Sequence, residues 1–89
     1  MSVYVDDAFI SWRGCKWCHM QADTIEELHT FASQLGLKRD WFQSSQRPDH
    51  DHYDITTSVR VRAIALGAIA ETASAGRARR QAIRDLKSD

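Results

Sequence analysis

The stretch that decides the fold spans residues 17–36 and reads WCHMQADTIEELHTFASQLG. Side chains in residues 17–21 alternate in direction along an extended chain, which places His19 on one face and Cys18 and Met20 on the other. This alternation predicts a β-strand. The residues that follow change to the helical period of about 3.6, so a helix comes directly after the strand.

The helix is predicted over about residues 24–35. Thr24 and Glu27 stand three apart, as in a capping box, and Asp23 offers an alternative cap. Gly36 follows where a left-handed C-terminal cap is wanted. The apolar side chains recur at helical spacing, at Ile25, Leu28, Ala32 and Leu35.

On the N-terminal side, residues 3–5 form a β-branched and aromatic run that predicts a first strand. That strand would deliver the carboxylates of Asp6 and Asp7 at its C-terminal end. Residues 8–15 contain Gly14 and little periodicity, so we predict a loop there.

On the C-terminal side, residues 44–51 are polar and contain Pro48, which predicts an exposed loop. Residues 52–55 alternate like a strand, and residues 56–58 supply caps for a second helix that we expect to end near Glu71. The apolar stripe of that helix would consist of Val61, Ile64, Ala65, Ala68 and Ile69.

The length of 89 residues and the hydrophobic content of 43% suit one compact domain and exclude a two-lobed enzyme. We predict an α/β fold, a single small domain whose sheet of about three short strands carries two packed helices. Residues 1–70 would be the core domain. Residues 71–89 would be a basic C-terminal appendage, helical or disordered, because five of the last thirteen residues are Arg or Lys.

The formal charge of zero argues against a dominant electrostatic attraction to nucleic acid or membrane. No stretch of eighteen apolar residues and no secretion signal occur, so we expect a cytoplasmic protein that does not enter a membrane. A homodimer would bury further surface for such a short chain.

Cys15, Cys18 and His19 match the CxxCH pattern of covalent haem attachment. That attachment requires export, so we do not expect haem. The two cysteines could also supply half of a zinc site completed by His29 or by His50 and His52, but their separation from those histidines is unusually long. Two ordinary cysteines are the simpler interpretation.

A second constellation needs no cysteine. Asp6, His19, His52 and Asp54 all fall on or beside predicted strand ends, where carboxylates and imidazoles serve as metal ligands or as acid and base. We take these four as candidate catalytic residues, and Asp6 and His52 as candidate ligands of a divalent metal. The alternative is structural, with the acids capping turns or pairing with arginines.

Aromatic and cationic side chains offer candidate ligand-binding residues. Trp12, Arg13 and Trp41 present faces that can hold a base or a phosphate. Arg60 lies in the first turn of the second predicted helix, where free N–H groups and the helix dipole attract anions. Solvated arginines and packed tryptophans are the alternative.

Several separated segments together resemble one known family. They are Val3 to Asp7, Trp17 to Met20 with Ala22 and Asp23, Glu27 to Ala32, Leu35 to Leu37, Trp41 to Gln43, His52 to Ile55, and Gly67 with Ala68. In order and spacing they are similar to the small bacterial and phage proteins called domain of unknown function 4031. The resemblance covers about residues 3–69 and leaves out the arginine-rich tail.

The resemblance adds Gln43, from the Trp-x-Gln segment, to the candidate ligand-binding residues. It weakens the haem and zinc interpretations, because the family pattern does not depend on a cysteine pair. It implies no activity, and its phage association suggests a setting of host takeover or counter-defence.

We therefore expect a phosphate-directed site for a nucleotide or nucleic acid, with Arg13 and Arg60 holding the anion. If the site is catalytic, metal-assisted phosphoester hydrolysis is the expected reaction. The rival hypothesis is a non-catalytic binding module that sequesters a nucleotide or docks on a host protein. A structural phage component is a third.

Overall fold

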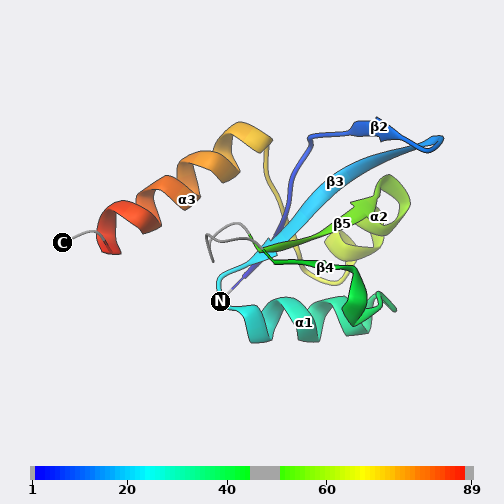
Figure 1. Ribbon diagram of the computed structural model, residues 1–89, viewed down its shortest axis with the longest axis horizontal. Helices are drawn as coiled ribbons and strands as arrows, with labels where there is room; N and C mark the ends of the chain where they lie inside the picture. The colour runs from blue at the N-terminus through cyan, green and yellow to red at the C-terminus, as the bar shows by residue number, and fades with distance from the viewer. Residues whose placement is uncertain (1, 45–50, 88–89) are drawn as a thin grey trace.

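The computed structural model of the chain describes residues 2–44 and 51–87 (Figure 1). Its strands are β1 (Val3–Val5), β2 (Ile10–Trp12), β3 (Cys15–Ala22), β4 (Phe42–Gln43), β5 (His52–Thr56) and β6 (Ile69–Ala70). Its helices are α1 (Ile25–Gln34), α2 (Thr57–Ala65) and α3 (Ala73–Lys87), with a 3₁₀ helix η1 (Arg39–Trp41) before β4.

The strands form one mixed sheet in the order β4-β5-β3-β1-β6, with β2 also paired to β3. The eight residues of β3 make it the central strand: β5 lies along one side, and β1 and β2 share the other. Among the paired strands of the described residues, only β1 and β6 run parallel. The chain is thus a small α/β domain, as predicted.

The expectation of about three strands is an undercount, because the described residues form a sheet of six. The loop predicted over residues 8–15 contains β2 and the turn into β3. All three residues of β2 are exposed, so no covered face imposes an alternating pattern on them. The strands β4 and β6 have two residues each, too few to show a period.

The sheet has one covered and one largely open face. Cys18 and Met20 of β3 point with Tyr53 and Ile55 of β5 into a core closed by α1 and α2. The helices contribute Leu28, Ala32, Leu35 and Ala63 to this core. Since strand side chains alternate, β3 turns Trp17, His19 and Gln21 to the opposite face. In Figure 1, α1 runs below the sheet and α3 lies above it at the far end.

Helix α1 confirms the prediction made from its caps. The Thr24 hydroxyl accepts from the backbone N–H of Glu27 at 3.2 Å, and Gly36 adopts a φ of +78°. Asp23 is not the cap. Its carboxylate accepts instead from the Ser2 N–H and the Tyr4 hydroxyl, which holds the start of the chain against the end of β3.

Helix α2 begins as predicted, with the Thr56 hydroxyl as its cap, but it ends at Ala65 and not near Glu71. Gly67, with a φ of +115°, turns the chain into β6. The predicted apolar stripe was also wrong in part, because Val61 is 66% exposed and the buried residue of the helix is Ala63. Ile69 continued the helical spacing only by coincidence and lies in β6.

Residues 73–87 of the basic tail form helix α3. The Asp7 carboxylate accepts from the Ala73 N–H at 2.8 Å and the Thr72 hydroxyl accepts from the Ala75 N–H at 2.9 Å, so the helix has two caps at its start. Among the described residues, no helix combines the length and the apolar character that crossing a membrane requires. The predicted loop over residues 44–51, with Pro48, falls almost wholly outside the described residues.

Candidate functional site

The site begins at an interruption between β1 and β2. Asp6 still follows the ladder of β1, since its N–H donates to the carbonyl of His19 at 3.1 Å. Residues 6–9 then oppose only two residues of β3, as in an enlarged β-bulge, and Phe9 takes a φ of +47°. This interruption places the carboxylate of Asp6 directly against His19.

The Asp6 carboxylate is fixed by several donors. Its Oδ1 accepts from the backbone N–H groups of His19 at 2.9 Å and of Ala8 at 3.2 Å, and its Oδ2 accepts from Nδ1 of His19 at 2.8 Å. The backbone carbonyl of Asp6 accepts from Nε of Arg60 at 2.7 Å. Burial by itself would raise the pKa of Asp6, but the hydrogen bonds from His19 and Ala8 outweigh it and lower that pKa.

The same contact sets the state of His19. The hydrogen bond to Asp6 raises the pKa of His19 above its usual value, against the opposing effect of burial, and the charges of Asp6 and Asp54 act in the same direction. With Nδ1–H donating to Asp6, a neutral ring carries its lone pair on Nε2. That nitrogen points toward β5.

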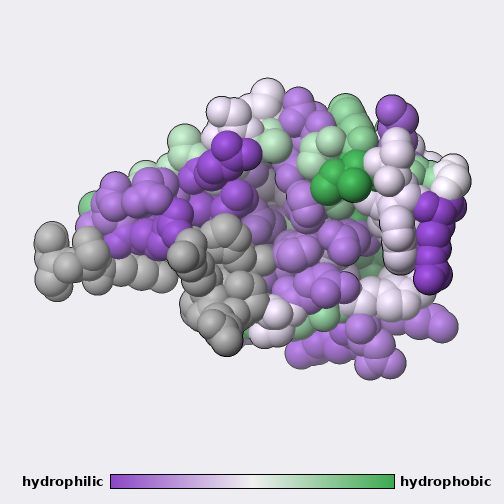
Figure 2. Space-filling model, turned by 45° about the horizontal axis from the view of Figure 1, so that its top comes forward, coloured by the Kyte–Doolittle hydropathy of each residue, from purple (hydrophilic) through white to green (hydrophobic). Residues whose placement is uncertain are grey.

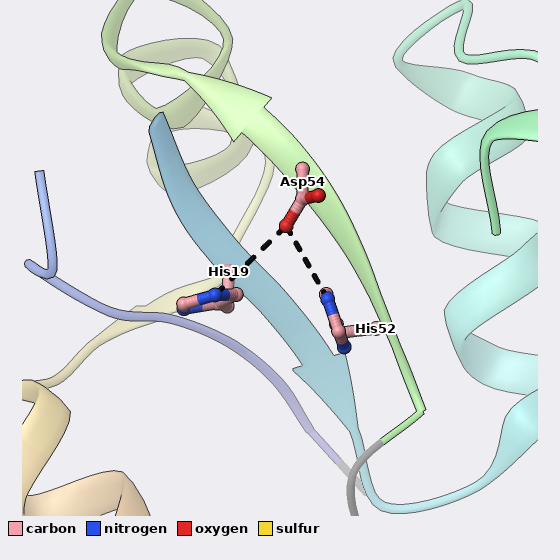
Figure 3. A group of neighbouring side chains, drawn as sticks. All are labelled: His19, His52 and Asp54. Atoms are coloured by element: carbon pink, nitrogen blue, oxygen red, sulfur yellow. Dashed lines mark ion pairs between the residues drawn. The ribbon is translucent and has the colours of Figure 1, made fainter. Parts of the chain in front are cut away.

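Strand β5 supplies the other members of the group (Figure 3). Asp54 is the direct register partner of His19, and Oδ1 of Asp54 lies 3.9 Å from Nε2 of His19. His52 stands two residues earlier on the same face, and its Nε2 lies 3.3 Å from that oxygen. One donor atom from each of these three side chains lies within 4.8 Å of the others.

Two of the three separations are close to those that a divalent metal ion requires. Ligand atoms about 2.0–2.1 Å from a tetrahedral ion are about 3.3 Å apart. The His52–Asp54 pair has that spacing, and the His19–Asp54 pair would need to close by roughly half an ångström. The two imidazole nitrogens, which lie within 4.8 Å of each other, would also have to approach one another. Asp6 also fits, as the outer carboxylate that commonly holds a metal-binding histidine by its other nitrogen.

The structure therefore gives different roles to His52 and Asp6, the two residues that were proposed from the sequence as metal ligands. His52 belongs to the three converging donors. Asp6 does not, because its carboxylate oxygens already accept from His19 and Ala8. The group that could hold an ion is His19, His52 and Asp54, and Asp6 orients its first member.

A groove of about 810 Å³ opens beside these donors. Trp12, Trp41 and Gln43, three of the predicted ligand-binding residues, line it together with Trp17. Figure 2 shows hydrophilic side chains across the middle of the molecule and a hydrophobic group directly above them and slightly to their right. The groove thus joins a polar group to aromatic walls.

Neither of the two predicted phosphate-holding arginines lines the groove. The guanidinium of Arg13 stacks on the Trp12 ring, with its central carbon 4.4 Å from the ring centre. Arg60 is engaged by the carbonyl of Asp6 and lies over the ring of Phe9. Within the described part of the chain, the groove is lined by no arginine or lysine.

The structure argues against any site built on the cysteine pair. Cys15 is exposed, whereas Cys18 is 1% exposed and packs in the core, on the opposite face of β3. Their sulfurs cannot hold one ion or one haem while β3 remains a strand. His29 shares a hydrogen bond with the Tyr53 hydroxyl at 2.7 Å, and His50 lies outside the described residues.

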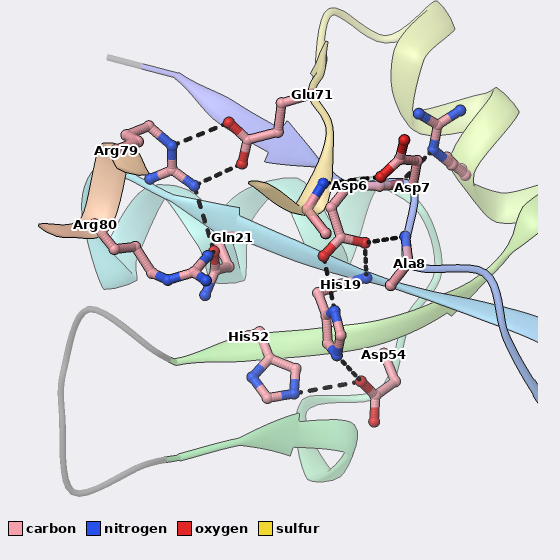
Figure 4. Close-up of polar contacts among 12 residues, drawn as sticks. Asp6, Asp7, Ala8, His19, Gln21, His52, Asp54, Glu71, Arg79 and Arg80 are labelled. Carbon is pink, nitrogen blue, oxygen red and sulfur yellow. Dashed lines mark hydrogen bonds and ion pairs between the residues drawn. The ribbon is translucent and has the colours of Figure 1, made fainter. Parts of the chain in front are cut away.

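A second polar network, which the sequence analysis missed, lies farther along the same face of β3 (Figure 4). Oε1 of Gln21 accepts from Arg80 at 2.7 Å and from Arg79 at 3.3 Å, and Arg79 pairs with Glu71 at 2.8 Å. The Arg79 guanidinium also stacks on Tyr4 at 3.8 Å. The only available signal was that Gln21 shares the face of His19, which by itself does not name its partners.

The chain matches the family described as Protein of unknown function (DUF4031) over residues 3–84, and it therefore belongs to that family. The match extends beyond residue 69, where the sequence resemblance stopped, and includes most of α3. No curated protein and no solved structure matches the chain.

Proposed function

We propose that this protein binds a divalent metal ion through His19, His52 and Asp54 and hydrolyses a phosphoester of a nucleotide or nucleic acid. The observation that carries the proposal is the convergence of two imidazole nitrogens and one carboxylate oxygen at the side of an aromatic groove. Asp6 supports it, since an outer carboxylate fixes the tautomer of a metal-binding histidine.

The donor set indicates which ions to test. Two imidazoles with one carboxylate suit zinc and related transition metals, whereas magnesium prefers oxygen ligands and keeps several waters. We therefore expect Zn²⁺, Mn²⁺ or Fe²⁺ to bind more tightly than Mg²⁺.

A bound ion would polarise the phosphoryl group and lower the pKa of a water molecule, which is the chemistry of metal-assisted ester hydrolysis. The chain itself supplies orientation. Asp6 holds the His19 ring by Nδ1, and the pairing of β3 with β5 fixes His19 opposite Asp54. Trp12, Trp41 and Gln43 would hold the base or sugar beside the reacting ester.

The test begins with metal binding, measured by calorimetry on the metal-free chain with Zn²⁺, Mn²⁺ and Mg²⁺. Hydrolysis of methyl p-nitrophenyl phosphate and of nucleotides is then followed with each ion and with EDTA. We expect turnover that EDTA removes and that His52→Ala and Asp54→Ala abolish. Asp85→Ala, which removes an exposed acid of α3, is the matched control and should behave as the wild type.

Turnover that persists in EDTA, or in both variants, would refute the catalytic proposal. One observation favours the rival, a binding module without catalysis: no arginine or lysine among the described residues lines the groove to neutralise charge in a transition state. The module predicts stoichiometric nucleotide binding without product. A protein that docks on a host partner or serves as a phage component predicts neither binding nor turnover.

A further inference from the structure

Two tryptophans line the groove while remaining widely exposed. Trp12 of β2 is 57% exposed and Trp41 of η1 is 49% exposed. Large aromatic rings left in water at a groove are more typical of a binding surface than of a core. Neither ring is needed to close the core of the sheet.

The two tryptophans come from separate parts of the sheet. Trp12 belongs to β2, and Trp41 immediately precedes β4, with β3 and β5 between those strands. Three strand spacings of about 4.8 Å, or roughly 14 Å, separate the backbones of β2 and β4. Trp12 pairs with Cys15, whereas Phe42 lies level with Met20, so the two tryptophans are also offset along the strands and would stack separate bases.

Each ring carries a cation. The Arg13 guanidinium stacks on Trp12, and Nζ of Lys38 lies 5.7 Å from the centre of the Trp41 ring. An aromatic platform beside a positive charge is the arrangement with which proteins hold unpaired bases and their phosphates. Nε1 of Trp17 also donates to the carbonyl of Trp12 at 2.9 Å, which steadies the first platform.

We propose that the groove binds a single strand of DNA or RNA, with unpaired bases stacked on Trp12 and Trp41 and the phosphodiester between them brought to His19, His52 and Asp54. This inference rests on the proposed function and narrows its substrate from nucleotides in general to single strands. A base pair in a duplex cannot offer its faces to such rings.

The test measures binding of fluorescein-labelled strands to the zinc-loaded full chain by fluorescence anisotropy. The probes are a ten-nucleotide DNA strand, the matching RNA strand, the DNA duplex and a mononucleotide. We expect a single strand of DNA, of RNA or of both to bind more tightly than the duplex and the mononucleotide. The preference between the two strands then names the nucleic acid.

Replacing either tryptophan by alanine should remove the stacking of one base. We expect Trp12→Ala and Trp41→Ala each to weaken strand binding about 5- to 150-fold, and the phenylalanine variants to recover most of the loss. Val61→Ala, which shortens an exposed apolar side chain on α2 away from the groove, is the matched control and should bind as the wild type. Thermal melting verifies that every variant is folded.

The inference is overturned if the single strands bind no more tightly than the mononucleotide, if the duplex binds equally well, or if both alanine variants bind as the wild type does. Zinc binding and hydrolysis of methyl p-nitrophenyl phosphate by the wild type test the proposed function separately. Strand binding without ester turnover supports the platforms and refutes the hydrolase. Ester turnover without a preference for single strands supports the hydrolase and refutes the stacking platforms.

Discussion

Two polar networks lie on the same face of β3 and differ in how their charges are met (Figure 4). The Gln21 network consists of Gln21, Glu71, Arg79 and Arg80; the His19 network consists of Asp6, His19, His52 and Asp54. In the first, the carboxylate of Glu71 meets a guanidinium at 2.8 Å, and the two side chains are only 12% and 19% exposed. In the second, the carboxylates of Asp6 and Asp54 face the imidazoles of His19 and His52 beside a groove.

The difference teaches what each network is suited for. The guanidinium of Arg79 already has a carboxylate partner in Glu71. Together with Arg80 it also donates to Gln21, and these bonds attach α3 to the sheet. Two carboxylates with imidazoles favour an added positive charge. In the metal-free chain the raised pKa of His19 means that the two carboxylates favour a positive charge on this ring. A bound metal ion would supply that positive charge in place of the proton.

Removing a ligand should have the largest effect. We expect Asp54→Ala to weaken zinc binding by more than the about 10- to 100-fold loss that outer partners typically produce, because the ion loses one of its three protein donors. Glu71→Gln, which changes a carboxylate of the Gln21 network, should leave zinc affinity unchanged in calorimetry. Equal effects of the two substitutions would erase the distinction between the networks.

Removing the outer carboxylate should have the next largest effect. Asp6→Asn leaves all three donors in place but weakens the hydrogen bond that orients His19, so we expect zinc affinity to fall about 10- to 100-fold. The neighbouring Asp7 provides the control, because its carboxylate caps α3 and an asparagine can still accept that bond. Zinc binding by Asp7→Asn as weak as that of Asp6→Asn would show that Asp6 acts only through the fold.

Arg79→Ala tests the structural network. The substitution leaves Glu71 without this guanidinium, and we expect the free energy of unfolding to fall by about 1–2 kcal/mol, less than for a fully buried pair. Urea denaturation measures the loss, and amide exchange should show it first in α3. Arg77→Ala, at an exposed position of the same helix, should cost little. Unchanged stability in Arg79→Ala would mean that α3 does not depend on this network.

The smallest effect concerns pH, and it contrasts two histidines of the metal-free chain. NMR titration should place the pKa of His19 above 6.5 and that of His29 below it, since burial and the charge of Arg39 disfavour a positive ring at His29. The stability contributed by His19 is complete below pH 6.5 and is lost as the pH rises through its raised pKa. The contribution of His29 is complete above pH 6.5 and is lost as the pH falls toward its lowered pKa. His19→Asn and His29→Asn should each remove the corresponding pH dependence of the stability. Coincident titration curves for the two histidines would contradict the opposite directions of their pKa shifts.

Much of the fold followed from local patterns in the chain. The alternation around Cys18 and Met20, and the caps Thr24 and Thr56, each depend on residues a few positions apart, and the structure confirms them. The end of α2 was predicted wrongly, because Ile69 continued the helical spacing past the turn at Gly67. Periodicity cannot detect a turn that a glycine makes without changing the pattern of apolar residues.

The members of the candidate site were named from sequence, but their roles were not. His19 and Asp54 meet because β3 pairs with β5 in a register that no local pattern states. Asp6 orients His19 because its carboxylate contacts that residue, which lies 13 positions later in the chain. Arg60, expected at a phosphate, is drawn to the carbonyl of Asp6, which lies 54 residues away in the chain.

By itself the sequence determined strands β1, β3 and β5, helix α1, the start of helix α2 and the polar residues that share one face of β3, because periodicity and capping act between near neighbours. Only the tertiary structure decided which of those polar groups neutralise one another and which stay open to the groove. That outcome depends on strand register and on where α3 lies, and both are set by contacts between residues far apart in the chain.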